Sequence, residues 1–351
     1  MEFIKASKLK EKPKNTNLKF GSVFTDYMLE MDYDQGKWSA PLICPYHDLT
    51  MSPATLCLHY GQGIFEGCKA FKNNQGEITL FRIDDNLARM NLSADRMCMP
   101  RLDVELVKQA LIELIKLEKD WIPVADGCSL YIRPTMVATD VGVGVRPGLQ
   151  YKFFVILSPV GAYLHGIDCP STIRIEDHYV RAAIGGTGEA KCMGNYATSL
   201  LAVDKAKKDG YDEVLWLDAA EHKYIEEVGA MNVIFVVDGK VITPALNGSI
   251  LRGITRDSVL KILRNEGIEV EERRISVEEL ITAHKAGKFT EMFGVGTAAV
   301  VSPVSVLAYK GVDYRINDGK VGEISKLAYY KLDDIRTRKT PDKFNWLTIV
   351  K

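Results

Sequence analysis

The chain has 351 residues, of which 46% are hydrophobic and 26% are charged, and its formal net charge is −1. These values are typical of a soluble globular protein, and the length favours two domains over one. A chain so close to neutral gives no reason to expect nucleic acid or an anionic membrane as a partner, and no apolar run is long enough to span a bilayer. A small molecule is therefore the expected ligand.

The cysteines predict a reducing environment. They stand at positions 44, 57, 68, 98, 128, 169 and 192, without a C-x-x-C pair. An odd number of scattered cysteines argues against a disulfide framework and against a zinc site. The first residues also lack the apolar segment of a secretory leader. We expect a cytoplasmic protein that needs no metal.

The first half of the chain mixes strands and helices. Apolar residues from Phe20 to Met31 alternate roughly as in a strand. A hairpin is expected at 69–82 with its turn at 73–76, followed by amphipathic helices at 84–97 and 104–117. Residues 129–134 and 151–157 form further strands, the second nearly continuous in apolar residues. The segment from 165 to 180 is irregular, and we place the connection between two domains there.

The second half alternates between helix and strand. A helix is expected after Lys191, a strand at 213–218, and a hairpin joining 233–237 to 241–243 across the Asp238-Gly239 turn. Helices follow from about 255 to 266, at 277–286 and at 323–336, with a strand ending at Phe293. Strands with single helices between them indicate the α/β class. The predicted domains are residues 1–164 and 181–351.

One stretch combines glycines, a lysine and a helix start. Gly185, Gly186 and Gly188 precede Lys191, and helical spacing begins at Asn195. The stretch matches neither a phosphate-binding P-loop nor a dinucleotide fingerprint. A lysine beside apolar residues at a loop-to-helix junction can lose its proton near neutral pH and attack a carbonyl. A solvated loop lysine is the alternative.

If Lys191 forms an imine, pyridoxal phosphate is the commonest aldehyde for it, and that cofactor needs an anion site and an acid facing its ring nitrogen. Thr255, at a helix start after glycine, could hold the phosphate, as could the turn at Thr297. Arg89 could add a full positive charge. Either Glu226 or Glu227, but not both, could face the ring, because neighbouring strand residues point to opposite sides. Taken singly, each of these residues could instead be structural.

Together these residues resemble a known family. The chain looks like a branched-chain amino acid aminotransferase of PLP fold type IV, a class shared with D-amino acid aminotransferases and aminodeoxychorismate lyases. The resemblance runs from Phe20 to about Pro303. It is carried by the motifs that begin at His59, Phe65, Tyr131, Gly161, Lys191, Glu227, Leu251 and Phe293.

The resemblance implies a smaller N-terminal α/β domain, a larger C-terminal domain and a cofactor at their interface. Lys191 would hold pyridoxal phosphate covalently and later move the proton between the substrate α-carbon and C4′ of the cofactor. Glu227, not Glu226, would face the ring nitrogen, and Tyr196 would bond the phenolate oxygen. The remaining cofactor contacts would come from Arg89, Leu251, Ile254, Thr255 and Thr297.

The resemblance also implies a substrate site and a homodimer. The lining residues would be Phe20, Tyr60, Phe65, Tyr131, Arg133, Val143, Tyr163, Ala230 and Ala298, with Tyr60, Tyr131 and Val143 supplied by the neighbouring subunit. Aromatic and aliphatic walls suit a branched apolar side chain. Arg133 or a tyrosine could meet the distal carboxylate of glutamate.

Two departures from the family stand out. The run from Ala299 to Ser302 lacks the C-x-x-C that some members use as a thiol switch, and Ala230 replaces a threonine found in some relatives.

The expected activity is reversible transamination of leucine, isoleucine or valine with 2-oxoglutarate. The alternatives are a D-amino acid aminotransferase, an aminodeoxychorismate lyase, or a non-enzymatic binding protein with the same fold. The sequence ranks neither the three amino acids nor the direction of the reaction, because one methylene in an apolar pocket changes binding by only about 1–3 kcal/mol.

Overall fold

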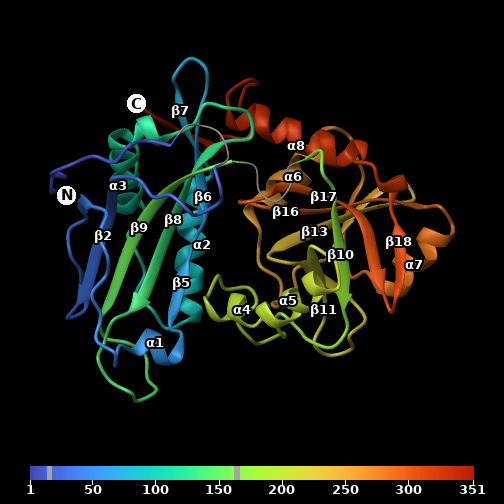
Figure 1. Ribbon diagram of the computed structural model, residues 1–351, viewed down its shortest axis with the longest axis horizontal. Coiled ribbons are helices and arrows are strands. Elements are labelled where there is room, and N and C mark those ends of the chain that lie inside the picture. Colours follow the sequence, from blue (N-terminus) through green and yellow to red (C-terminus); the bar gives the residue numbers. More distant parts are fainter. Residues whose placement is uncertain (14–17, 162–166) are drawn as a thin grey trace. The chain divides into compact units, whose positions relative to one another are not determined.

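A computed structural model describes residues 1–13, 18–161 and 167–351 (Figure 1). The chain forms two compact units. Unit 1 contains residues 1–161, 190–193 and 335–351, and unit 2 contains residues 162–189 and 194–334. Lys191 therefore belongs to unit 1, although the residues on either side of 190–193 belong to unit 2. The domain boundaries expected at 164 and 181 stay a prediction.

Unit 1 is built on a mostly antiparallel sheet. Its strands run in the order β1 (Glu2–Phe3), β4 (Leu42–Pro45), β2 (Tyr27–Asp34), β9 (Tyr151–Val160), β8 (Ser129–Ala138), β6 (Cys68–Lys72), β7 (Ile78–Phe81) and β19 (Leu347–Val350). Two short strands join at the side, since β3 (Lys37–Trp38) pairs with β2 and β5 (Gly63–Phe65) pairs with β8. The C-terminal strand β19 thus closes the edge beside β7.

Helices α2 (Ile83–Arg96) and α3 (Val104–Leu117) supply apolar side chains to the core of this unit. Leu87 and Met90 of α2 and Leu111 and Leu114 of α3 are fully buried with the sheet residue Phe153. The Asp103 side chain caps α3 by accepting a hydrogen bond from the Leu106 N–H. The short helices α1 (Leu56–Tyr60) and η1 (Lys119–Trp121) complete unit 1.

Unit 2 contains a closed ring of strands. Its sheet runs β12 (Ile225–Val228), β11 (Glu213–Leu217), β10 (Ser171–Glu176), β17 (Val300–Tyr309), β16 (Phe289–Gly296), β13 (Met231–Val237), β14 (Lys240–Thr243) and β15 (Val270–Glu272). Because β12 pairs with both β11 and β13, the first six strands close on themselves, and β18 (Val312–Arg315) pairs with β17. Glu227 lies on the strand that closes the ring.

The helices of unit 2 are α4 (Gly194–Ala197), α5 (Leu200–Lys208), α6 (Ile254–Asn265), α7 (Val277–Lys285), α8 (Glu323–Arg336), which runs across the boundary of the units at residue 334, and the 3-10 turn η2 (Asn317–Gly319). Ser276 caps α7 through the Glu279 N–H. Gly253 stands at the cap position of α6 and provides no side chain there. The N-cap residue of α6 therefore contributes no side-chain hydrogen bond to the positive end of the helix.

Most expected elements are confirmed, including the mixed α/β class, the helices of unit 1 and both hairpins. Asp238 and Gly239 have φ angles of 52° and 77°, as a tight two-residue hairpin turn requires. Two expectations are wrong. The strand expected from Phe20 is β2, which starts at Tyr27, and the segment expected to be irregular contains β10, which pairs in parallel with β11 and β17.

A buried carboxylic acid holds the start of β2 to the end of α3. Glu118 accepts a hydrogen bond from the Tyr27 N–H, and Asp26 accepts one from the Trp121 indole at 2.9 Å. Burial of Glu118, aided by the charge of Asp26, raises the pKa of the Glu118 carboxyl to about 7. In the unfolded chain the same carboxyl titrates at an ordinary value near 4.5.

This difference in pKa predicts a pH-dependent stability. Between pH 4.5 and pH 7 the folded state keeps the Glu118 proton and the unfolded state loses it, so stability falls as pH rises. The free energy of unfolding of the wild type should fall by about 2 kcal/mol across this range. Glu118→Gln, which mimics the protonated acid, should not show this fall. Urea denaturation of both proteins at several pH values checks it. The same dependence of the free energy of unfolding on pH in both proteins would contradict the assignment.

Candidate active site

The backbone holds the segment of Lys191 against β5. The Phe65 N–H donates to the Lys191 carbonyl at 3.0 Å, and the Met193 N–H donates to the Gly63 carbonyl at 3.1 Å. The Lys191 N–H donates to the Ser93 hydroxyl of α2 at 2.9 Å. The side-chain amine lies 5.1 Å from the centre of the Phe65 ring, a cation–π contact. The position of this lysine is therefore fixed by both β5 and α2.

A buried ion pair lies next in sequence to Phe65. The Glu66 side chain is inaccessible to solvent, and its two oxygens accept hydrogen bonds from Nε of Arg89 at 2.7 Å and Nη2 at 2.9 Å. Asn86 donates to the same carboxylate at 2.8 Å. Burial alone would raise the pKa of Glu66, but the charge and hydrogen bonds of Arg89 outweigh it, so the pKa lies below its ordinary value. The charge of Arg89 is thus shared with Glu66.

Four residues expected at the substrate site lie together in unit 1. The rings of Phe20 and Tyr131 meet edge to face with centroids 4.7 Å apart. The Arg133 guanidinium lies 4.6 Å from the Phe65 ring centre and donates to the Tyr131 hydroxyl at 2.9 Å. Burial raises the pKa of Tyr131. The structure therefore brings aromatic walls and one cation into a single cluster.

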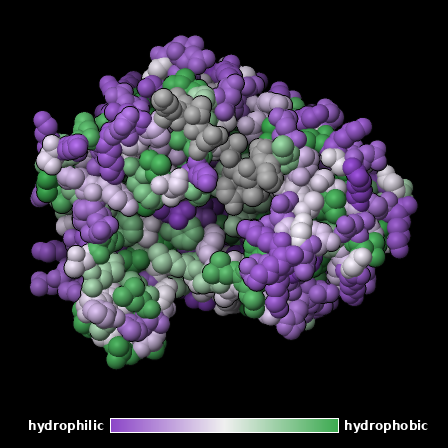
Figure 2. Space-filling model, viewed as in Figure 1, coloured by the Kyte–Doolittle hydropathy of each residue, from purple (hydrophilic) through white to green (hydrophobic). Residues whose placement is uncertain are grey.

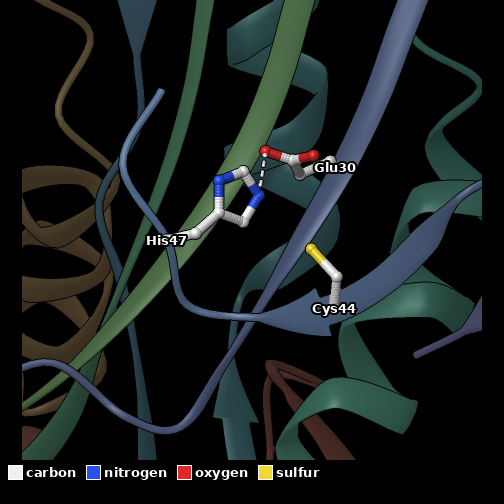
Figure 3. A group of neighbouring side chains, drawn as sticks. All are labelled: Glu30, Cys44 and His47. Atoms are coloured by element: carbon white, nitrogen blue, oxygen red, sulfur yellow. Dashed lines mark ion pairs between the residues drawn. The ribbon is translucent and has the colours of Figure 1, made fainter. Parts of the chain in front are cut away.

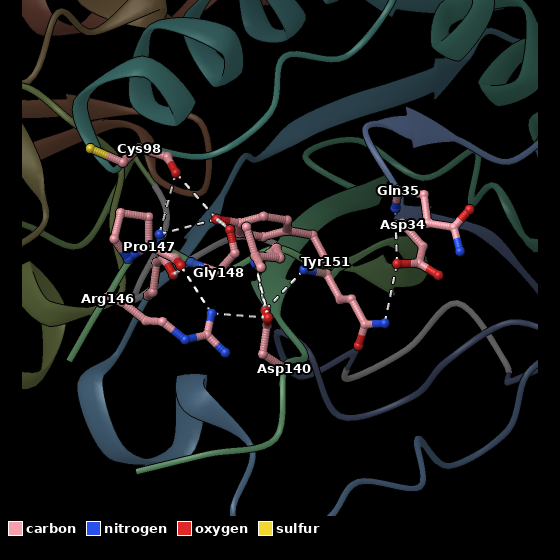
Figure 4. Close-up of polar contacts among 11 residues, drawn as sticks. Asp34, Gln35, Cys98, Asp140, Arg146, Pro147, Gly148 and Tyr151 are labelled. Atoms are coloured by element: carbon pink, nitrogen blue, oxygen red, sulfur yellow. Dashed lines mark hydrogen bonds and ion pairs between the residues drawn. The ribbon is translucent and has the colours of Figure 1, made fainter. Parts of the chain in front are cut away.

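Tyr60 and Val143 form a second group. The Tyr60 hydroxyl donates to the Val143 carbonyl, within a loop at residues 139–150 whose Val143 side chain is 67% exposed. Asp140 organises this loop by accepting hydrogen bonds from the N–H groups of Leu149 and Gln150 and from Arg146 (Figure 4). These donors overcome the effect of burial and lower the pKa of Asp140.

In unit 2, Glu227 is buried and hydrogen-bonded. Its Oε1 accepts from the Leu251 N–H at 2.7 Å and pairs with Nη2 of Arg181 at 3.1 Å. Glu226 faces the other way, accepting from the Ser249 hydroxyl and from Asn247, beside a pocket of about 500 Å³. The alternation of the strand thus gives the two glutamates different partners.

The start of α6 is fitted closely to β13. Asn232 lies opposite Glu227 and donates to the Leu251 carbonyl at 2.9 Å. A Cβ atom on Gly253 would overlap Oδ1 of Asn232, so only glycine fits there. Ile254 and Thr255, both buried, begin the helix immediately afterwards. Leu251, Ile254 and Thr255 are therefore connected to Glu227 through Asn232 and the backbone.

The remaining expected residues of unit 2 lie at turns and helix ends. Thr297 and Ala298 stand between β16 and β17, Ala230 in the turn from β12 to β13, and Tyr196 on α4. A Cβ atom on Gly294 of β16 would lie 2.7 Å from the Met231 methyl, so a larger residue there would displace the flexible end of Met231. Tyr163 lies outside the described residues.

These residues fit pyridoxal phosphate. A phosphate dianion suits a helix end that carries glycine in place of a capping side chain, as at Gly253. A ring nitrogen that must stay protonated suits a buried carboxylate that is itself paired with a cation, as Glu227 is. The sequence predicts that Lys191 provides the amine. Which residue makes which contact stays a prediction from the sequence.

Several residues of these networks had no role in the sequence analysis, among them Glu66, Arg181 and Asn232. Glu66 and Asn232 stand inside motifs noted there, and both are buried polar residues, which need hydrogen-bond partners. Arg181 stands outside every motif. No local pattern identifies it, because its partners are distant in the sequence.

One group of side chains outside this site could in principle ligate a metal, and it lies between β2 and the end of β4. Atoms of Glu30, Cys44 and His47 come within 4.8 Å of one another (Figure 3). Burial, aided by Glu30, raises the pKa of the Cys44 thiol to about 11, and Lys152 already lies 3.6 Å from Glu30. A protonated thiol beside a lysine is a poor metal ligand, so we interpret the group as an ion-pair cluster.

Comparison with known proteins identifies the family. The Amino-transferase class IV family model matches residues 63–307. Branched-chain-amino-acid transaminase 1 of Bacillus subtilis is 51% identical and covers 96% of this chain and 95% of its own length.

Two solved structures with a similar fold are also branched-chain amino acid aminotransferases. The Escherichia coli branched-chain amino acid aminotransferase has a TM-score of 0.75 at 28% identity, covering 93% of this chain and 99% of that one. The branched-chain amino acid aminotransferase from Thermobaculum terrenum, solved in its PLP-form, has a TM-score of 0.76 at 25% identity, covering 93% and 98%. Among the described residues, no helix has both the length and the apolar character needed to cross a membrane.

The Glu66–Arg89 pair leads to a stability prediction. Removing one partner of a buried pair leaves the other charge uncompensated, so Glu66→Gln should lower the free energy of unfolding by about 3–5 kcal/mol at neutral pH. Because the folded pKa of Glu66 is lowered, the difference should shrink as pH falls below 4.5. Urea denaturation measures both effects. The matched control is Glu77→Gln, whose partly exposed ion pair with Arg338 should contribute about 0–1 kcal/mol.

Proposed function

The chain belongs to the class IV aminotransferases and, within them, to the branched-chain amino acid aminotransferases, which transaminate branched-chain amino acids; we propose that it does so with pyridoxal 5'-phosphate as cofactor and 2-oxoglutarate as amino acceptor. The amino donors are leucine, isoleucine and valine. Glutamate is the amino donor in the reverse direction.

The observation that carries this proposal is the environment of Glu227. A buried carboxylate is costly unless it is paired, and here one oxygen receives both a backbone N–H and an arginine. A carboxylate held in this way stays ionised and can keep a pyridine nitrogen protonated. Leu251, which is bonded to Glu227 and to Asn232, lies two residues before Gly253 and the start of α6. A helix start of this kind suits a phosphate.

Bound pyridoxal phosphate supplies an electron sink for the bond broken at the substrate's α-carbon. The chain's own residues then move protons and hold groups in place. Lys191 Nζ would hold the cofactor before substrate binds and would afterwards carry the proton between the α-carbon and C4′. Glu227 would keep the ring nitrogen protonated, and Tyr196 would donate to the phenolate oxygen. Arg89, Ile254, Thr255 and Thr297 would hold the phosphate, and Leu251 would contact the ring.

The aromatic cluster of unit 1 supports substrate binding. Phe20, Phe65 and Tyr131 offer apolar surface for a branched side chain. The family resemblance adds Tyr163, Ala230 and Ala298 to the substrate site. Arg133 lies within that cluster, and its guanidinium can meet the distal carboxylate of glutamate or 2-oxoglutarate. One site can thereby take both kinds of substrate.

We propose a homodimer from the exposed loop of unit 1. The side chains of Val141, Val143 and Val145 are 64%, 67% and 83% exposed. Figure 2 shows hydrophobic residues among hydrophilic ones at the end of unit 1 where Figure 1 places α1. Exposed apolar groups of this kind favour a protein partner. In the proposed dimer, Tyr60 and Val143 reach the neighbouring subunit's substrate site, whereas Tyr131 packs on Phe20 of its own chain.

A cytoplasmic location follows from the thiols in this proposal. All seven cysteines are free, although several are accessible. Such thiols persist in a reducing compartment.

Lys191→Ala should abolish transamination while leaving the fold intact, because the amine that holds the cofactor and moves the proton is lost. Turnover of L-leucine with 2-oxoglutarate and the circular dichroism spectrum measure the two effects. Borohydride reduction of the wild-type holoenzyme followed by peptide mapping should label position 191. Labelling at another lysine, or turnover by Lys191→Ala, would refute the assignment.

Glu227→Gln and Glu226→Gln form a matched pair on one strand. Glu227→Gln should lower kcat about a hundredfold or more, because an amide cannot keep the ring nitrogen protonated; this corresponds to about 3 kcal/mol. Glu226→Gln should change kcat by less than about threefold, since its partners are Ser249 and Asn247. Steady-state kinetics of both variants decide between them, and equal losses would mean that Glu227 lacks this role.

A further inference from the structure

Arg181 connects three segments of unit 2. Its Nη2 donates to the Ser249 carbonyl at 2.6 Å and to the Gly188 carbonyl at 3.0 Å, and it pairs with Glu227 at 3.1 Å. These partners belong to the glycine-rich loop before Lys191, to the segment that leads into α6, and to β12. One guanidinium group thus bonds to Glu227 and to the two segments that lead into Lys191 and into α6.

The fit around Arg181 is tight. Its side chain is only 8% exposed, and Glu227 is 3% exposed. A Cβ atom on Gly188 would overlap the Ser249 carbonyl oxygen, so the loop reaches this position only because residue 188 is glycine. Two of the segments that Arg181 connects are therefore already in backbone contact, and the arginine spans them.

The charge of the Glu227 carboxylate is compensated by Arg181. The residues that β11 and β13 place opposite Glu227 are Trp216 and Asn232, neither of which is charged, and Leu251 contributes a main-chain N–H. The neighbouring Glu226 faces the opposite side of β12. Arg181 provides Glu227 with a cation at 3.1 Å.

We propose that Arg181 is a positioning residue, which keeps the Glu227 carboxylate ionised and oriented toward the cofactor ring and holds the Gly188 and Ser249 segments against β12. The inference rests on the proposed function, because the role of Glu227 does. It assigns to Arg181 two separable effects, one of charge and one of shape. A lysine can replace the charge, but its flexible ammonium does not reproduce the planar group that places Nη2 within reach of all three acceptors.

The test compares Arg181→Gln, Arg181→Lys and the control Arg174→Gln, which removes an arginine of β10 that is bonded to Asp209. The first measurement is the pH profile of kcat/KM of the holoenzyme. Arg181→Gln should move the acid limb toward neutral pH by about 1–3 units, the effect of losing an opposite charge at this distance. Arg181→Lys should move it back by at least half. An acid limb of Arg181→Gln that coincides with that of the wild type would overturn the proposal.

The second measurement needs no activity. In the cofactor-free protein, Arg181→Gln deprives a buried carboxylate of this cation, so its melting temperature should fall. Adding Glu227→Gln to this variant removes the charge of the carboxylate and should recover part of the lost melting temperature. A double variant that is no more stable than Arg181→Gln would overturn the charge effect. If wild type and Arg174→Gln both lack transamination, the proposed function fails, while the melting comparison still tests Arg181.

Discussion

The carboxylate of Glu227 is the constraint on which the rest of unit 2 depends. A charge buried among strands is tolerated only when donors surround it, and here a backbone N–H and a guanidinium meet one oxygen. The Leu251 N–H is available because Asn232 fixes the same peptide segment through the Leu251 carbonyl. Gly253 follows because no side chain fits against Asn232. The acid and the helix end are therefore parts of one hydrogen-bonded arrangement.

Unit 1 also contains a buried carboxylate whose charge is compensated by neighbouring donors. Glu66 is completely buried and is compensated by Arg89 and Asn86, both from α2. The same helix provides Ser93, which accepts the backbone N–H of Lys191. The lysine segment and the ion pair are thus both held by α2, and β5 fixes the other side of the segment through Phe65 and Gly63. Buried polar groups that must be satisfied give this region its fixed geometry.

Local patterns predicted those elements whose stability is local. Helices α2 and α3 carry clear helical spacing, and the Asp238-Gly239 hairpin has a turn dipeptide suited to its positive φ angles. The prediction failed at β10, since its polar and charged residues hide a strand that is stabilised by parallel partners far away in the sequence, Glu213 to Trp216 and Val304 to Ala308. The prediction also began strand β2 too early, at Phe20, whose ring packs on Tyr131 instead.

By itself the sequence determined the family, and it predicted the reactive lysine, the acids and the glycines, because these depend on residue type and spacing along the chain. It also limited the acid to one of two glutamates, since adjacent strand residues face opposite sides. Only the tertiary structure showed that Arg181 bonds Glu227, Gly188 and Ser249 together, and that Arg89 shares its charge with Glu66. Such pairings join residues up to 68 positions apart, as Arg181 and Ser249 are. They arise only when burial excludes water and leaves each charged group dependent on the partner that the fold provides.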